Sequence, residues 1–323
     1  LHKEAGANGG GCFTLPGSAL EVRATLRNAS FIENKAGASG GAMHLILESN
    51  VLMTSVGPAF VSLRRNSAFS GGAVSALGES AVLFSGAVDV SDNTAQAYGG
   101  AIYSEKSSLE FSCHSAASVV NGCVQPQVTA NSAQIDGGAV FALLSSVRAS
   151  DTSFTSNSAV RGGGIACILS SIHGNRTVFS NNAASADGAA MDLRTGDTAV
   201  LNSCTVEHNI AAGSGGAISA NAPQVLHTTT SSFVHNSAVS GRGGAIAITA
   251  SKASDASFSG TQFKYNSAGE LGGAIYAVNT GSSSTECAAA QAVSPSLASV
   301  AAATPSHAQA PAPEAPAPAA QQA

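Results

Sequence analysis

The chain has 323 residues, of which 44% are hydrophobic, only 10% are charged and 35 are glycine. This content can build a sizeable core, so it excludes a chain that is disordered throughout, and the few charges indicate a surface of small and hydroxylated side chains. The 14 basic and 19 acidic residues give a net charge of −5, which argues against nucleic acid as a partner. No apolar run reaches the roughly 18 residues of a membrane-spanning helix.

One pattern recurs in chain order. An apolar residue, two variable positions and Asn are followed by a short polar stretch, and then by Gly-Gly-Ala, or a close variant, and a long or branched apolar residue. The nine copies span residues 31–43, 63–74, 90–102, 128–140, 154–165, 179–191, 206–218, 233–246 and 263–275. Successive asparagines lie 25 to 38 residues apart, a period typical of solenoids whose longer repeats contain insertions.

The residues after each glycine pair alternate with a period of two. Met43, Leu45 and Leu47 are expected on one face, as are Val140, Ala142 and Leu144, and then Ile165, Cys167 and Leu169. Such alternation predicts strands and excludes helical repeats, which need a period of 3.6.

These features predict an all-β parallel β-helix of about ten coils over residues 1–287, with two or three short strands in each coil. Residues 9–13 are expected to form the second half of an incomplete coil. From residue 288 the composition changes to Ala, Pro and Gln, which predicts a disordered tail or linker over 288–323.

The asparagines should stack at a turn, where each amide can both donate to and accept from its neighbours in adjacent coils. The apolar residue three positions earlier should point into the rod, and the paired glycines should supply backbone conformations that a Cβ forbids. The expected ladder consists of Asn34, Asn66, Asn93, Asn131, Asn157, Asn182, Asn209, Asn236 and Asn266.

The alternating motifs, as in Gly99-Gly100-Ala101-Ile102 and Phe154-Thr155-Ser156-Asn157, resemble the repeat of the polymorphic outer membrane proteins of chlamydiae. The resemblance covers about residues 9–277. It implies a single-stranded, right-handed, pectate-lyase-like parallel β-helix exported to the cell surface, at the outer membrane in bacteria, and acting in adhesion.

The cysteines point to a disulfide and not to a metal site. Cys113 and Cys123 flank a short polar segment and would close a surface loop in an oxidising compartment. No cysteine forms the closely spaced pairs with histidine that structural zinc needs, and no cofactor motif is present, so we expect neither metal nor cofactor. Cys167 is expected inside as a small apolar residue.

One set of charged residues could support catalysis. Asp136, Arg161 and Asp187 each precede the glycine of their motif in three successive coils, so they should stack as an acid, base and acid column. A polysaccharide lyase could use the arginine as base. The alternative interpretation is a solvent-exposed charge ladder of little energetic value.

Aromatic and histidine side chains offer weaker candidates. His208 and His235 share the position before Asn in adjacent coils and should stack, although two imidazoles without a third ligand would hold a metal weakly. Tyr103, Phe141 and Tyr276 occupy the outward position after the motif, where they could contact a partner or pack on a loop.

Two functions therefore remain open. The first is a non-catalytic extracellular or cell-surface scaffold for structure or adhesion, whose partner is a cell-surface protein, a carbohydrate or a second copy of the chain. The second is a polysaccharide lyase or glycoside hydrolase acting on acidic polysaccharide through Asp136, Arg161 and Asp187.

Overall fold

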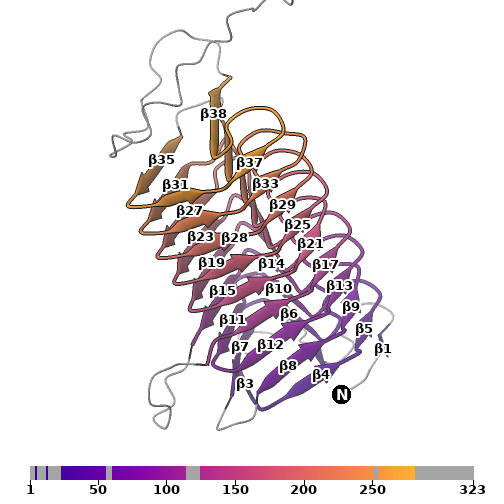
Figure 1. The fold of residues 1–323 in the computed structure, drawn as a ribbon. Helices are drawn as coiled ribbons and strands as arrows, with labels where there is room; N and C mark the ends of the chain where they lie inside the picture. The colour runs from indigo at the N-terminus through magenta and orange to yellow at the C-terminus, as the bar shows by residue number, and fades with distance from the viewer. Residues whose placement is uncertain are drawn as a thin grey trace, which may run out of the picture.

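The computed structural model describes residues 4–5, 12–13, 23–55, 60–113, 124–250 and 254–280. Within these ranges the regular elements are β-strands, and each strand pairs in parallel with its equivalent in the neighbouring coil. Figure 1 shows the strands of one sheet side by side, so that the colour changes evenly along the stack. The fold is a parallel β-solenoid, as the repeats predict, and it has about nine turns where about ten coils were expected. No helix able to cross a membrane is found in these ranges.

Each full coil contributes one strand to each of four sheets, where the sequence predicted two or three strands. Sheet 1 follows the glycine motif and contains β2 (Cys12–Phe13), β6 (Met43–Ile46), β10 (Val74–Leu77), β14 (Ile102–Glu105), β18 (Val140–Leu143), β22 (Ile165–Ile168), β26 (Met191–Leu193), β30 (Ile218–Asn221), β34 (Ile246–Ala250) and β38 (Ile275–Asn279). Sheet 2 follows in each coil and contains β3 (Arg23–Arg27), β7 (Asn50–Thr54), β11 (Ala81–Ser85), β15 (Ser108–Ser112), β19 (Ser146–Ser150), β23 (Ser171–Asn175), β27 (Thr198–Asn202), β31 (Val225–Thr229) and β35 (Asp255–Ser259).

The other two sheets flank the recurring asparagine. Sheet 3 precedes it and contains β4 (Ser30–Ile32), β8 (Val61–Arg64), β12 (Val88–Ser91), β16 (Gln127–Thr129), β20 (Ser153–Thr155), β24 (Val178–Ser180), β28 (Thr205–Glu207), β32 (Ser232–Val234) and β36 (Gln262–Lys264). Sheet 4 follows it with two-residue strands: β1 (Glu4–Ala5), β5 (Lys35–Ala36), β9 (Ser67–Ala68), β13 (Thr94–Ala95), β17 (Ser132–Ala133), β21 (Ser158–Ala159), β25 (Ala183–Ala184), β29 (Ile210–Ala211), β33 (Ser237–Ala238) and β37 (Ser267–Ala268).

A continuous apolar core fills the rod. The motif's first apolar residue points inward as predicted, and Leu63, Val128 and Phe154 are fully buried. Rings of adjacent coils stack there, with 5.1 Å between the centroids of Phe154 and Phe179 and an interplanar angle of 6°. Because each coil places its inward residues over those of the coil before, the core runs unbroken along the stack.

The alternation after the glycine motif ends earlier than predicted. Leu47, Leu144 and Leu169 were expected on the inward face, but they are 59%, 45% and 52% exposed. Each lies just beyond its strand at a corner, with a positive φ of 48°, 52° and 51°. A residue in the left-handed region interrupts the two-residue period of a strand, so the chain turns and the side chain points to solvent.

Glycine is required at the two positions of each pair for different reasons, as Gly99 and Gly100 show. Gly99 has a φ of 64°, in the left-handed region that favours glycine. A Cβ on Gly100 would lie 2.1 Å from the carbonyl oxygen of Gly138 in the next coil. The first glycine therefore permits the turn, and the second permits neighbouring coils to approach.

Two predictions concern the ends of the chain, the incomplete first coil and the C-terminal tail. Strand β2 pairs in register with Met43 and His44 of β6, so residues 12–13 belong to a coil, as expected for the segment 9–13. The predicted tail, residues 288–323, lies outside the described residues, and so does the boundary at residue 287. The tail and the right-handed sense of the coil stay predictions.

We predict that Gly100→Ala lowers the free energy of unfolding by about 3 kcal/mol or more, because the new Cβ would collide with backbone of the next coil. Gly174→Ala is the matched control. Its Cβ would meet the side-chain ends of Leu201 and Cys204, at 2.9 and 3.2 Å, which can move, and would be in ordinary contact with the Cβ of Thr177 at 3.9 Å. Denaturant unfolding checks both variants, and equal losses of stability would contradict the role given to Gly100.

Candidate functional site

The nine recurring asparagines form one column along the rod. In each step the backbone N–H and the Nδ2 amide of one asparagine both donate to Oδ1 of the asparagine in the next coil, at 2.8 to 3.1 Å. The column contains Asn34, Asn66, Asn93, Asn131, Asn157, Asn182, Asn209, Asn236 and Asn266. This ladder joins successive coils through their side chains.

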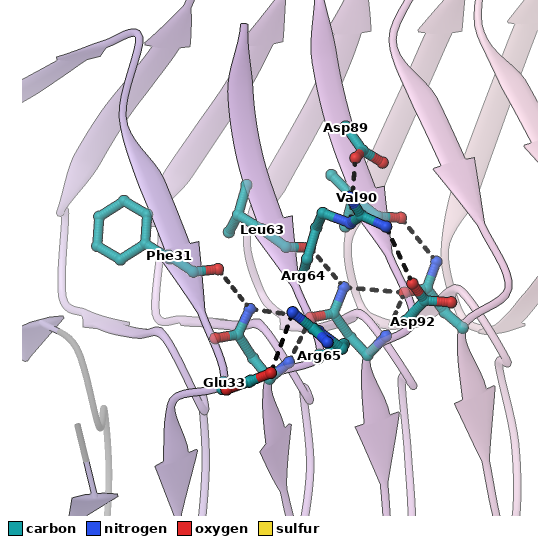
Figure 2. Close-up of polar contacts among 11 residues, drawn as sticks. Phe31, Glu33, Leu63, Arg64, Arg65, Asp89, Val90 and Asp92 are labelled. Atoms are coloured by element: carbon teal, nitrogen blue, oxygen red, sulfur yellow. Dashed lines mark hydrogen bonds and ion pairs between the residues drawn. The ribbon is translucent and has the colours of Figure 1, made fainter. Parts of the chain in front are cut away.

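The same amides also bind the coil behind them. From Asn66 onward, Nδ2 donates a further bond to the carbonyl group of the motif's apolar residue in the preceding coil, at 2.8 to 3.0 Å. Figure 2 shows the first of these acceptors, the carbonyl groups of Phe31, Leu63 and Val90. All the ladder asparagines except Asn266 are 0 to 1% exposed, so the bonds are shielded from water.

The predicted catalytic column is only partly assembled. Arg161 donates two hydrogen bonds to Asp136, from Nε to Oδ1 at 2.9 Å and from Nη2 to Oδ2 at 3.3 Å. Asp187 is not part of this pair. Its Oδ1 instead accepts a bond from the backbone N–H of Ser214, at 2.6 Å. The three residues hold equivalent places in successive coils, since the N–H groups of Gly137 and Gly162 donate to the carbonyl groups of Arg161 and Asp187. Of the three, only Asp136 and Arg161 form an ion pair with each other.

A second arginine, which the sequence reading missed, completes the cluster. Arg194 Nη2 lies 2.7 Å from Asp136 Oδ2, and Arg194 Nε lies 2.9 Å from Asp192 Oδ2. The carboxylates of Asp136 and Asp192 are 2% and 5% exposed. Burial raises the pKa of Asp192, and the nearby Arg194 opposes that shift. Both arginines thus form ion pairs with buried carboxylates.

Asp197 is a further buried charged residue that lies outside the recurring motif. It occupies a corner at which Ser145 and Ser170 stand in preceding coils, and its carboxylate accepts the backbone N–H groups of Ser170 and Arg194. Burial raises the pKa of Asp197 to about 7, although those two N–H groups act in the opposite direction. The signal available in the sequence was the replacement of a recurring serine.

The cysteines fall into two groups. Cys167 is a free, fully buried thiol on β22, where burial raises its pKa well above the usual value, and it packs in the core as expected. Cys113 is disulfide-bonded. Its predicted partner, Cys123, lies outside the described residues, so their pairing stays a prediction.

The aromatic and histidine side chains that were considered as contact sites have different surroundings. Phe141 is 4% exposed, stacks on Tyr103 with 5.7 Å between the ring centroids, and meets Tyr98 in a tilted arrangement at 4.8 Å. Tyr276 lies under the guanidinium of Arg242, 5.1 Å from its ring centroid. Each of these rings therefore already packs against another side chain of the same chain. His208 and His235 do stack, as predicted, with centroids 5.1 Å apart.

Two hollows on the described surface are lined by residues outside the charged cluster. One, of about 350 Å³, is apolar and lies over sheet 4 between Ala183, Ile210 and Val239. Another, of about 120 Å³, is lined by Lys35, Thr94 and Gln134, among others. Across the described ranges, no three His, Cys, Asp or Glu side chains are arranged to hold a metal ion. Glycoside hydrolysis needs two carboxylates open to a sugar, and neither hollow offers them.

We predict that Asn182→Ala lowers the free energy of unfolding by about 3 kcal/mol. The change removes the acceptor of the Asn157 amides and a donor to Phe154 and Asn209, and buried polar groups without partners cost about 1 to 3 kcal/mol each. Asn181→Ala alters the adjacent, exposed residue and should cost less than about 1 kcal/mol. Calorimetric melting compares the two, and similar melting temperatures would contradict the ladder's importance.

We predict that Asp197→Asn gains stability relative to the native chain as pH rises from 4 to 7. The pKa of Asp197 is higher in the folded chain, about 7, than its ordinary value of 3.8. The folded state therefore holds the proton more tightly, and the stabilisation present at acid pH is lost as pH rises through this window. The difference should change by up to about 1.4 kcal/mol per pH unit.

Urea unfolding at several pH values measures this difference. Asp92→Asn, at a corner where the side chain is 43% exposed, controls for loss of one surface carboxylate. Parallel stability curves for Asp197→Asn and the native chain would show that Asp197 is not titrating in this window.

The model of the Chlamydia polymorphic membrane protein repeat matches residues 87–105, 203–221 and 260–278. Each match contains one complete copy of the motif, including Asn93, Asn209 or Asn266, and this confirms the resemblance seen in the sequence. No curated protein and no solved structure matches the chain. The chain is thus a parallel β-solenoid that carries the Chlamydia polymorphic membrane protein repeat at three positions.

Proposed function

We propose that this chain is a non-catalytic rod outside the cell, at the cell surface, which presents its faces and flank loops to a cell-surface protein or carbohydrate and so acts in adhesion. The observation that carries the proposal is the unbroken asparagine ladder over nine coils. A ladder of this kind stiffens a scaffold but performs no chemistry.

Two features support the proposed location outside the cell. The repeat is named for membrane proteins, and Cys113 is disulfide-bonded. Disulfides persist in oxidising environments such as the bacterial periplasm and the cell exterior. A surface location in a bacterium would place the rod at the outer membrane.

The charged cluster supports a structural role more than an enzymatic one. A general base must reach a substrate proton, whereas Arg161 and Arg194 both hold the buried carboxylate of Asp136. Removing one partner of a buried ion pair is strongly destabilising. The cluster is therefore best explained as a set of ion pairs that joins neighbouring coils.

Two assays on the purified chain test the proposal. It should bind formaldehyde-fixed animal cells saturably, and it should release no unsaturated products or reducing ends from pectin or alginate, with or without calcium. Trypsin or periodate treatment of the cells distinguishes protein from carbohydrate as the partner. Absence of saturable binding would contradict the adhesive role, and turnover that Arg161→Ala abolishes would establish the lyase or hydrolase instead.

A further inference from the structure

Three exposed rings form a column on the corner that precedes the asparagine ladder. The ring centroids of His208 and His235 are 5.1 Å apart with an interplanar angle of 21°, and those of His235 and Tyr265 are 4.9 Å apart with an angle of 15°. All three side chains are exposed. We define these residues as the ring column. Its spacing follows the distance between coils, so the ladder beneath holds the rings face to face.

The backbone at this corner does not favour such residues. His208, His235 and Tyr265 have φ values of 54°, 55° and 55°, in a region that is unusual for bulky side chains. Ser156 and Asn181 occupy the same corner in the two coils before, with φ values of 58° and 54°. The turn therefore needs no ring. The positive φ is thus a property of the corner in successive coils, and the rings are an addition to it.

Packing among the described residues does not account for the position of the Tyr265 side chain. It is 76% exposed, more than any other large hydrophobic residue in the described ranges. One face of its ring rests on His235, and the opposite face meets no other ring of the described residues. By contrast, Phe141 is 4% exposed between its two tyrosine neighbours. Among the described residues the column therefore ends in an exposed, flat aromatic ring.

We propose that the ring column is a carbohydrate-binding site, in which a neutral pyranose stacks on the open face of Tyr265. This inference rests on the adhesive function proposed above and names its ligand. The C–H groups on one face of a pyranose are apolar and complement the negative face of an aromatic ring. Gln262 and Lys264 lie on the same edge strand, β36, and both are exposed, so they can bind the sugar hydroxyls.

Two other ligand classes fit this surface less well. Imidazoles in nearly parallel planes cannot both direct a nitrogen lone pair at one metal ion without breaking the stack, and two ligands alone hold a metal weakly. A nucleobase could stack on Tyr265, but the net charge of −5 repels the attached phosphates. A neutral sugar has neither disadvantage.

Titration of the full chain with chitotetraose and cellotetraose tests the site. The chain has no Trp and only 4 Tyr, so tyrosine fluorescence and the Tyr265 ring signals in NMR report binding directly. We expect saturable binding, on the order of 1 mM, by at least one oligosaccharide. Tyr265→Ala should weaken it at least tenfold, and Tyr265→Phe should retain it.

Phe69→Ala is the matched control, because Phe69 is 50% exposed on another face and should leave affinity unchanged. A Tyr265→Ala variant that binds as tightly as the native chain would overturn the inference, and so would absence of saturable binding by both sugars. If the sugars fail to bind while the chain still binds cells, only this inference falls. If cell binding is absent, the adhesive function falls with it.

Discussion

The fold depends on a buried asparagine that repeats once in every coil. Its side chain places two donors and one acceptor within reach of the coils on either side, and from Asn66 to Asn236 the ladder uses all three. Aspartate would lack the donors, and serine would supply only one. Because the bonds are buried, a shift of one residue in any coil would leave several polar groups without partners, and each would carry a desolvation cost. The ladder therefore fixes how the coils align.

Because the coils are aligned, side chains at equivalent positions of the repeat form columns along the rod. Residues that share a position in the repeat lie over one another, so the corner after sheet 3 carries ion pairs near its first coils and the ring column near its last. Another corner stacks serines and then Asp197. The scaffold is the same throughout, whereas the exposed columns change from coil to coil. Variation in those columns can alter what the rod contacts without disturbing the core.

The regular part of the structure could be predicted because each requirement is local and recurs. The asparagines, the inward residues such as Phe154 and the glycine pairs recur in coil after coil. The charged cluster could not be predicted in full, because Arg194 reaches Asp136 two coils away. Its reach depends on side-chain conformation and on the small Ala166 that lies in register between Phe141 and Asp192. Leu47 was misplaced because alternation alone does not show where a strand ends.

Hydrogen exchange of the asparagine side-chain amides tests the ladder most directly. With the chain labelled with ¹⁵N only at asparagine, the account predicts slowly exchanging Nδ2 protons for Asn66, Asn93, Asn131, Asn157, Asn182, Asn209 and Asn236, each of which donates both to a carbonyl group and to an Oδ1. Buried bonds of this kind open only when the surrounding structure opens. Exchange of these seven side chains as fast as that of the exposed Asn181 would contradict the account.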